Sequence, residues 1–232
     1  MDDIADAADA LIAEIAECVT VGLHLDQVPG RPGQDLPDVG LPANYRRIYT
    51  RGTPEFLDAL TTGKLDRLPP PPVPATPAAV DRAESLVGGP LPPVLKRLYL
   101  EVANGGFGPG HGVLGLDGGY ADDLKRTAIG ILGERDDGIW PGMPRDLLPV
   151  CHWGCAIYSF VHCPSGQMIG WDPNPTEPED DVPYFEQEYT IETWLEAWLD
   201  GSLNQPWLIV DERTGEYRGA TAAETRAALT QQ

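Results

Sequence analysis

The chain has 232 residues, of which 42% are hydrophobic, and it carries 36 acidic against 16 basic residues, giving a formal net charge of −20. Nucleic acids and anionic membranes bind basic surfaces, so this charge argues against both as partners and favours encounter with a basic protein. A high net charge can also do no more than keep a protein soluble, and composition does not distinguish this role from attraction of a basic partner.

The sequence shows no targeting or membrane segment. Its first 30 residues contain neither Lys nor Arg, and Asp and Glu interrupt the apolar runs there. Of the four cysteines, Cys18 stands apart while Cys151, Cys155 and Cys163 lie close together, which is not the pattern of a secreted disulfide framework. We therefore expect a protein of the reducing cytoplasm.

Residues 1–75 are expected to form an N-terminal helical extension, made of a helix, an irregular segment, a short helix and a proline-rich connector. Apolar residues recur every three or four positions across 3–22, which predicts an amphipathic helix. This helix either covers the core or contacts a second copy, so a monomer or a weak homodimer is expected. Residues 45–50 favour a strand, and Thr53-Pro54 is typical of a helix start. The run PPPPVPATP at 69–77 fits neither a helix interior nor a central strand and marks a boundary.

Two helices are predicted next. The first begins at Thr76-Pro77 and ends at Gly88-Gly89, because Thr is a good N-cap and Gly a good C-cap. The second begins at Pro92 and ends at Asn104-Gly105-Gly106. The pair has few basic residues, so we interpret it as structural and not as a DNA-reading helix pair.

A glycine-rich stretch follows at 106–120. It matches G-x-G-x-x-G by letter, but no strand precedes it and no helix clearly follows, so a phosphate-binding loop is not expected. We predict instead a loop that leads into a short strand at 113–116, and then a helix and a loop within 122–137.

Residues 147–174 form the predicted centre of the fold. Three short apolar runs alternate with turn signals, which predicts adjacent antiparallel strands. The stretch also holds cysteines and histidines, the ligand types that zinc prefers. A single C-x-x-x-C is weak evidence for a metal site, and strand alternation puts Cys155 and Cys163 on the face opposite to His162. We therefore predict no metal, no cofactor and no catalytic residue, and keep a Cys/His metal-dependent enzyme as the least favoured alternative.

Acidic and aromatic residues are interleaved directly after this stretch. No Lys or Arg occurs anywhere in 146–212. Charge steers a basic partner and aromatic anchors hold it, so we predict a partner-binding surface here. Its candidate residues are Glu177, Glu179, Asp180, Asp181, Tyr184, Phe185, Glu186 and Glu188, with Trp153 and Asp172 near its edge. The alternative is an acidic loop without a specific partner.

The end of the chain is predicted to be helical at two places. Thr190 caps a strongly amphipathic helix that runs to Leu199. Residues 206–232 are expected to pack on the domain as a strand at 207–210, a turn, and a short helix that begins with the capping box Thr221-x-x-Glu224.

The order of these signals resembles the SUKH superfamily, which includes Smi/Knr-type regulators of cell-wall synthesis and many bacterial immunity proteins. The resemblance covers residues 76–205. It is carried by residues 89–92, Leu95, Tyr99, 104–106, Leu148-Pro149, Trp153-Gly154, Gly166, Trp171-Asp172 and 190–199. It implies an α+β domain with a mainly antiparallel sheet flanked by helices, and no catalysis.

The resemblance also implies roles for particular residues and for the whole protein. Motif positions with a structural role are Pro92, Asn104, Gly105, Gly106, Gly154, Gly166 and Trp171. Bacterial members look like immunity proteins that neutralise a toxin, often a nuclease, so the expected partner is a basic toxin domain. A regulatory or scaffold protein of the Smi/Knr type is the alternative.

Overall fold

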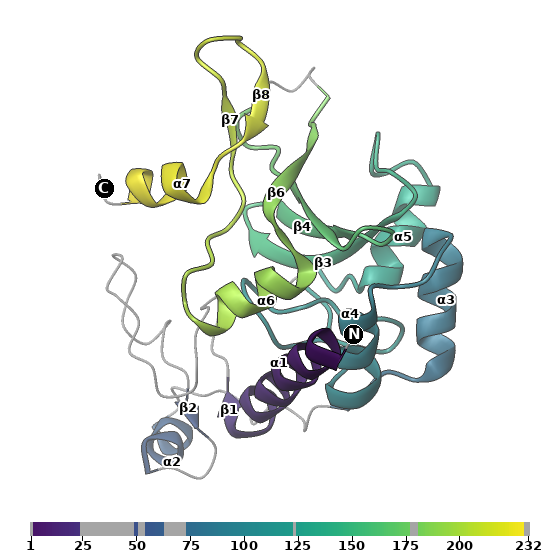
Figure 1. Ribbon diagram of the computed structural model, residues 1–232, viewed down its shortest axis with the longest axis vertical. Helices are drawn as coiled ribbons and strands as arrows, with labels where there is room; N and C mark the ends of the chain where they lie inside the picture. The colour runs from purple at the N-terminus through teal and green to yellow at the C-terminus, as the bar shows by residue number, and fades with distance from the viewer. Residues whose placement is uncertain are drawn as a thin grey trace.

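The computed structural model describes residues 2–23, 49–50, 54–62, 73–122, 124–176 and 181–229. Their elements form the expected α+β arrangement, in which an antiparallel sheet is flanked by helices (Figure 1). Most of the strand predicted at 45–50 and the prolines at 69–72 lie outside the described residues.

A four-stranded antiparallel sheet forms the centre of the fold, and its strands lie side by side in chain order. They are β3 (Leu147–Gly154), β4 (Ile157–His162), β5 (Gln167–Trp171) and β6 (Tyr184–Thr190). The first three confirm the predicted antiparallel strands. The fourth was not predicted as a strand, because the glutamates between its aromatic residues weaken the strand signal.

The two halves of this sheet are covered to different extents. Every residue of β3 and β4 is buried except the last of each strand, so both faces are covered there. Along β5, buried residues alternate with half-buried ones, and β6 buries only Phe185 fully. This is the pattern of an antiparallel sheet with one face toward solvent.

Helices cover the sheet from two sides (Figure 1). α6 (Ile191–Leu199) packs on β5 and β6, and its fully buried Trp194 meets Trp153 edge-on with ring centroids 6.2 Å apart. α5 (Ala128–Asp136) and α3 (Pro77–Val87) pack together and against β3. The caps predicted for α3 and α6 are confirmed: Thr76 and Thr190 accept from backbone N–H groups in the first turns.

The N-terminal helix α1 (Asp2–Val21) contributes to the same core. Leu11, Ile12 and Ile15 are buried, and α1 contacts α6 and the helical segment that follows α4. The middle of the apolar side of the predicted amphipathic helix is therefore covered within the chain. The smaller elements of this region are β1 (Gly22–Leu23), β2 (Tyr49–Thr50) and α2 (Pro54–Thr61).

The second predicted helix exists as α4 (Pro93–Arg97), which widens into the π-helix η2 (Leu98–Val102). The glycine-rich loop behind it is held by Asn104, whose Oδ1 accepts from the Leu116 N–H at 2.7 Å. Gly105 has φ +81°, and a Cβ there would lie 2.5 Å from the Val113 carbonyl oxygen, so only glycine fits.

The strand predicted at 113–116 is wrong. Val113 forms only an isolated bridge with Cys151. The N–H groups of Gly115 and Leu116 are bonded to Tyr120 and to the Asn104 side chain, so they are not available for a ladder.

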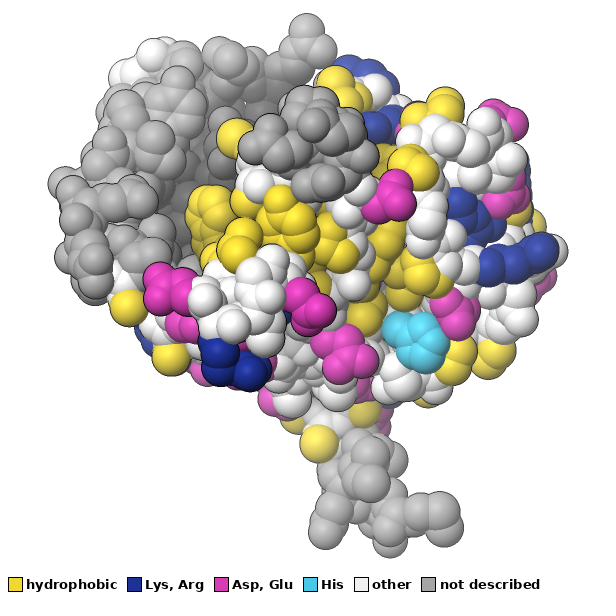
Figure 2. All heavy atoms as spheres, turned by 90° about the horizontal axis from the view of Figure 1, so that it is seen from above, with side chains coloured by type: hydrophobic (Ala, Val, Ile, Leu, Met, Phe, Trp, Pro, Cys, Tyr) yellow, Lys and Arg dark blue, Asp and Glu magenta, His cyan; other side chains and the backbone are white. Residues whose placement is uncertain are grey.

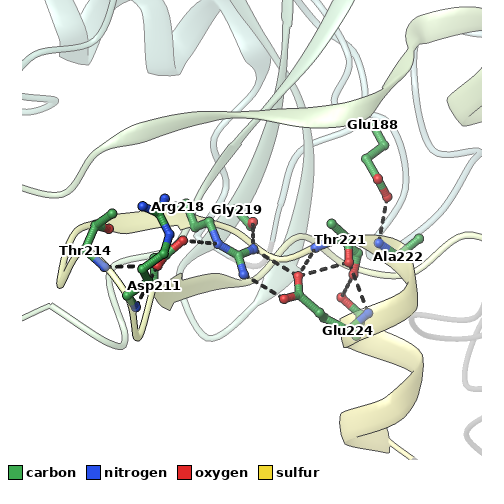
Figure 3. A network of polar contacts seen from close by, with 10 residues as sticks. Glu188, Asp211, Thr214, Arg218, Gly219, Thr221, Ala222 and Glu224 are labelled. Carbon is green, nitrogen blue, oxygen red and sulfur yellow. Dashed lines mark hydrogen bonds and ion pairs between the residues drawn. The ribbon is translucent and has the colours of Figure 1, made fainter.

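The C-terminal residues form a hairpin and a helix: β7 (Leu208–Val210), β8 (Tyr217–Gly219) and α7 (Ala222–Leu229). The predicted capping box is confirmed, since the N–H groups of Thr221 and Glu224 donate to each other's side chains at 2.8 and 3.2 Å. Arg218, on β8, joins the capping box to the hairpin turn, because it forms ion pairs with both Glu224 and Asp211 (Figure 3). Hydrogen bonds from Arg218 and Thr221 lower the pKa of Glu224 to about 2.

The turn between β3 and β4 has an unusual sequence for its geometry. Cys155 and Ala156 have φ angles of 48° and 60°, so both occupy the left-handed region. A two-residue hairpin loop with this geometry favours Asn and Gly, because other residues lose about 1–2 kcal/mol each there. Both side chains are exposed, so no packing compensates for this strain.

We expect Ala156→Gly to stabilise the protein by about 0.5–1 kcal/mol, because relief of the left-handed strain exceeds the added entropy of the unfolded chain. Chemical denaturation measures the change in the free energy of unfolding. Ala78→Gly, at an exposed position of α3, is the matched control and should destabilise by up to about 1 kcal/mol. Equal losses in both variants would contradict the prediction.

Candidate functional site

Aromatic side chains cross one face of the sheet from β3 to β6. The register pairs His152 with Tyr158, Tyr158 with Trp171 and Trp171 with Tyr184, so these four side chains share a face. Successive ring centroids in this row are 4.6, 6.4 and 6.4 Å apart. Trp140, from the segment after α5, lies 5.1 Å from both Tyr158 and Trp171. We call these five residues the aromatic face.

The aromatic face is covered at its β3–β4 end and open at its β5–β6 end. Tyr158 is 1% exposed and Trp140 6%, whereas Trp171 and Tyr184 are only half-buried. The reason is that α5 packs against β3, while α6 covers the other face of β5 and β6. In the view onto the end with the β7–β8 hairpin, hydrophobic side chains gather between acidic and basic ones (Figure 2).

The guanidinium of Arg126 is enclosed at the covered end. Its Cζ lies 5.6 Å from the ring centroid of Trp140 and 5.4 Å from that of Tyr158, distances typical of cation–π contacts. Its Nε donates to Asp122 Oδ2 at 3.1 Å, and another of its nitrogens donates to the Tyr158 hydroxyl. Nη1 lies 3.7 Å from Glu134 Oε2. Two rings and two carboxylates thus surround one cation.

Asp122 is the buried anchor of this cluster, with 2% of its surface exposed. Burial alone raises the pKa of its carboxyl group. Hydrogen bonds from the Arg126 N–H, the Tyr158 hydroxyl and the guanidinium outweigh this effect, and the pKa lies below its ordinary value. Asp122 therefore stays ionised and balances the charge of Arg126 near neutral pH.

Acidic side chains border the open end. Glu186 pairs in register with Ile169, which places its side chain on the same face as Ile169 and Tyr184. Glu186 and Asp181 are exposed, and neither pairs with a basic side chain among the residues that the structure describes. We call Ile169, Trp171, Tyr184 and Glu186 the open patch. Burial raises the pKa of the Tyr184 hydroxyl, so Tyr184 stays neutral and the negative charge of the open patch comes from Glu186.

Three residues predicted to bind a partner are buried instead. Trp153 is 8% exposed; its Nε1 donates to Ser159 Oγ at 2.9 Å and its ring packs on α6. Asp172 is 1% exposed and accepts from the N–H groups of Asn174 and Leu208 at 3.0 and 3.1 Å, so it joins the end of β5 to β7. Phe185 lies against Gly170 and Gly219. The prediction that these side chains face a partner is therefore corrected: they organise the core.

The other predicted residues divide into three groups. Glu188 is exposed, but its Oε2 accepts from the Ala222 N–H at 2.7 Å, so it holds the start of α7 on the domain (Figure 3). Glu177, Glu179 and Asp180 lie outside the described residues. Tyr184 and Glu186 lie on β6 at the accessible end of the aromatic face, where Tyr184 pairs with Trp171, and the exposed Asp181 lies three residues before Tyr184.

Sequence reasoning missed the residues at the covered end. Asp122 and Arg126 are four positions apart and opposite in charge, a spacing that could have identified them as a pair. Their burial beneath Trp140 depends on contacts with β4, which lies more than 30 positions further along the chain. No local pattern contains that information.

The cysteines do not form a reactive group. Burial raises the pKa of the Cys151 thiol far above its ordinary value and that of Cys163 to about 12, so neither is an activated thiolate. Cys155 lies apart in the β3–β4 turn. Within the described parts of the chain, no group of three or more His, Cys, Asp or Glu side chains is arranged to hold a metal ion.

His162 takes part in a Ser–His–Asp contact that the sequence did not suggest. Its Nδ1 lies 2.6 Å from Ser165 Oγ and its Nε2 lies 3.1 Å from Asp146 Oδ2. The nearby N–H groups of Ser165 and Gly166 both donate to the His162 carbonyl, so they cannot stabilise an oxyanion. The contact therefore fixes the β4–β5 turn.

No family model, curated protein or solved structure matches this chain. None of the helices in the described residues combines the length and the apolar character needed to cross a membrane.

We expect Asp122→Asn to destabilise the protein by about 1–3 kcal/mol at pH 7, because it removes a charged acceptor from a buried guanidinium. The folded pKa of Asp122 is depressed, so its contribution is complete above the ordinary pKa of about 3.9 and is lost as the pH falls through the lower folded value. Urea denaturation at pH 7 and at pH 3 should therefore show the difference from wild type shrinking with acid. Asp81→Asn, at an exposed position of α3, is the control; a similar loss there would contradict the assignment.

Proposed function

We propose that this chain is a non-enzymatic, cytoplasmic protein-binding domain of the immunity-protein kind, which binds and neutralises a basic toxin domain. The observation that carries the proposal is the open patch: half-buried aromatic rings on the same face as the exposed Glu186, on a chain with a net charge of −20. The resemblance of residues 76–205 to the SUKH superfamily supports the same function.

Two physical effects would contribute to binding: electrostatic attraction and apolar contact. The acidic field raises the rate of encounter with a positively charged partner, and this effect weakens as salt is added. Trp171 and Tyr184 then supply rigid apolar area at low entropic cost, which is the property of side chains that dominate interfaces. A nuclease presents basic groups to its nucleic acid, so an acidic domain seated on them would exclude the substrate.

The open patch also has the mechanical support that recognition requires. Trp171 packs on Trp140, and Phe160 contacts Tyr184 edge-on with ring centroids 5.6 Å apart. The rings therefore rest on a buried layer and lose little freedom when a partner binds. This rigidity favours affinity, because fewer side chains have to be ordered in the complex.

Asp181→Lys combined with Glu186→Lys should lower the association rate for the basic partner about tenfold or more, because it reverses two exposed charges on and directly before β6. The partner to test first is the product of the adjacent gene, with binding measured by surface plasmon resonance at several salt concentrations. Asp81→Lys with Glu196→Lys is the matched control, since it changes the net charge equally on exposed positions of α3 and α6. Failure to bind any basic protein, or equal losses in both double variants, would overturn the proposal.

A further inference from the structure

Arg126 demonstrates how this face of the sheet holds a guanidinium. Its cation lies within 5.6 Å of two ring centroids, those of Trp140 and Tyr158, and Asp122 accepts from its Nε. The arrangement combines a flat aromatic surface with a carboxylate at its border. These are the two features that favour arginine over lysine, because the guanidinium is planar, stacks on rings and donates in a fixed fork.

The open end of the aromatic face also combines a flat aromatic surface with a carboxylate at its border, but there no cation of the described chain lies between them. The rings of Trp171 and Tyr184 are nearly parallel, with an interplanar angle of 29° and centroids 6.4 Å apart. Glu186 lies two positions after Tyr184 on β6, so both side chains point to the same face of the strand. In the described part of the chain, no arginine or lysine makes a cation–π contact with either ring, and Glu186 has no ion pair.

The two ends of the aromatic face are also continuous. Trp140 contacts both Tyr158, which holds Arg126, and Trp171, which belongs to the open patch. They differ in cover: Tyr158 is 1% exposed, whereas Trp171 and Tyr184 remain accessible. A side chain arriving from outside therefore reaches the second pair of rings and not the first.

We propose that Trp171, Tyr184 and Glu186 form a binding site for one arginine side chain of the basic partner. The guanidinium stacks on the accessible part of these half-buried rings and donates to the Glu186 carboxylate, as Arg126 does with Tyr158, Trp140 and Asp122. This inference rests on the proposed function, because it identifies the partner group that the open patch recognises.

The experiment uses the full chain and two short probes, acetyl-Gly-Arg-Gly-amide and acetyl-Gly-Lys-Gly-amide. Indole N–H signals are followed by NMR during titration, and Trp171→Leu assigns the Trp171 signal. The Trp171 signal should shift and saturate with the arginine probe, and binding of the lysine probe should be about threefold to tenfold weaker. Glu186→Gln should weaken binding of the arginine probe about threefold or more, whereas Asp81→Asn should leave it unchanged.

Two results would overturn the site. One is an equal response to both probes that Glu186→Gln and Asp81→Asn reduce alike, which is the behaviour of unspecific charge attraction. The other is a Trp171 signal that does not move while other indole signals do. Glu186 is exposed, so its variant stays interpretable even where Trp171→Leu disturbs folding, and Trp207→Leu serves as a control for loss of a half-buried indole.

Failure of this site and failure of the proposed function are distinguishable. A protein that captures its basic partner with unchanged affinity after Glu186→Gln contradicts the arginine site and leaves the function standing. A protein that binds the arginine probe at Trp171 but binds no basic protein contradicts the function and leaves the site standing.

Discussion

Unequal cover of a single antiparallel sheet determines the rest of this structure. An apolar sheet face has to be removed from water, and here α5, with α3 beside it, packs against β3, while α6 packs on the other face at β5 and β6. The β3–β4 half is therefore buried on both sides and holds the core. The β5–β6 half keeps one face accessible. The position of the candidate site follows from this asymmetry, because the aromatic face is buried at β4 and becomes partly accessible at β5.

The buried polar groups serve to hold that geometry. Asp122 and Arg126 balance each other beneath Trp140; loss of Arg126 would leave the buried Asp122 carboxylate without a cation, and loss of Asp122 would leave Arg126 only the longer contact with Glu134. Asp172 joins the end of β5 to β7. Glu188 accepts from the first turn of α7. Acids that look alike in the sequence thus differ in the structure: Asp122, Asp172 and Glu188 fix the scaffold, whereas Asp181 and Glu186 are exposed.

The fold was largely predictable from local signals, and the site was predictable only in part. Thr76, Thr190 and Thr221 identified helix starts, because a capping residue acts within one turn. The antiparallel strands were recognisable from their turns. β6 was missed because its glutamates obscure its alternation, and the 113–116 strand was wrong because Asn104 takes the N–H of Leu116. Trp153 and Asp172 were misjudged for a different reason, because burial is a property of the assembled sheet. Asp172 and Asp181 belong to the same acidic part of the sequence, yet Asp172 is buried and Asp181 is exposed.

Hydrogen–deuterium exchange on a complex with the proposed basic partner tests whether the open patch is the binding surface, because it reports which backbone segments the partner covers. We expect added protection in peptides that span 167–171 and 181–190, with α3 and α1 unchanged. Protection confined to α1 or α3, with 167–171 and 181–190 exchanging as in the free protein, would contradict it.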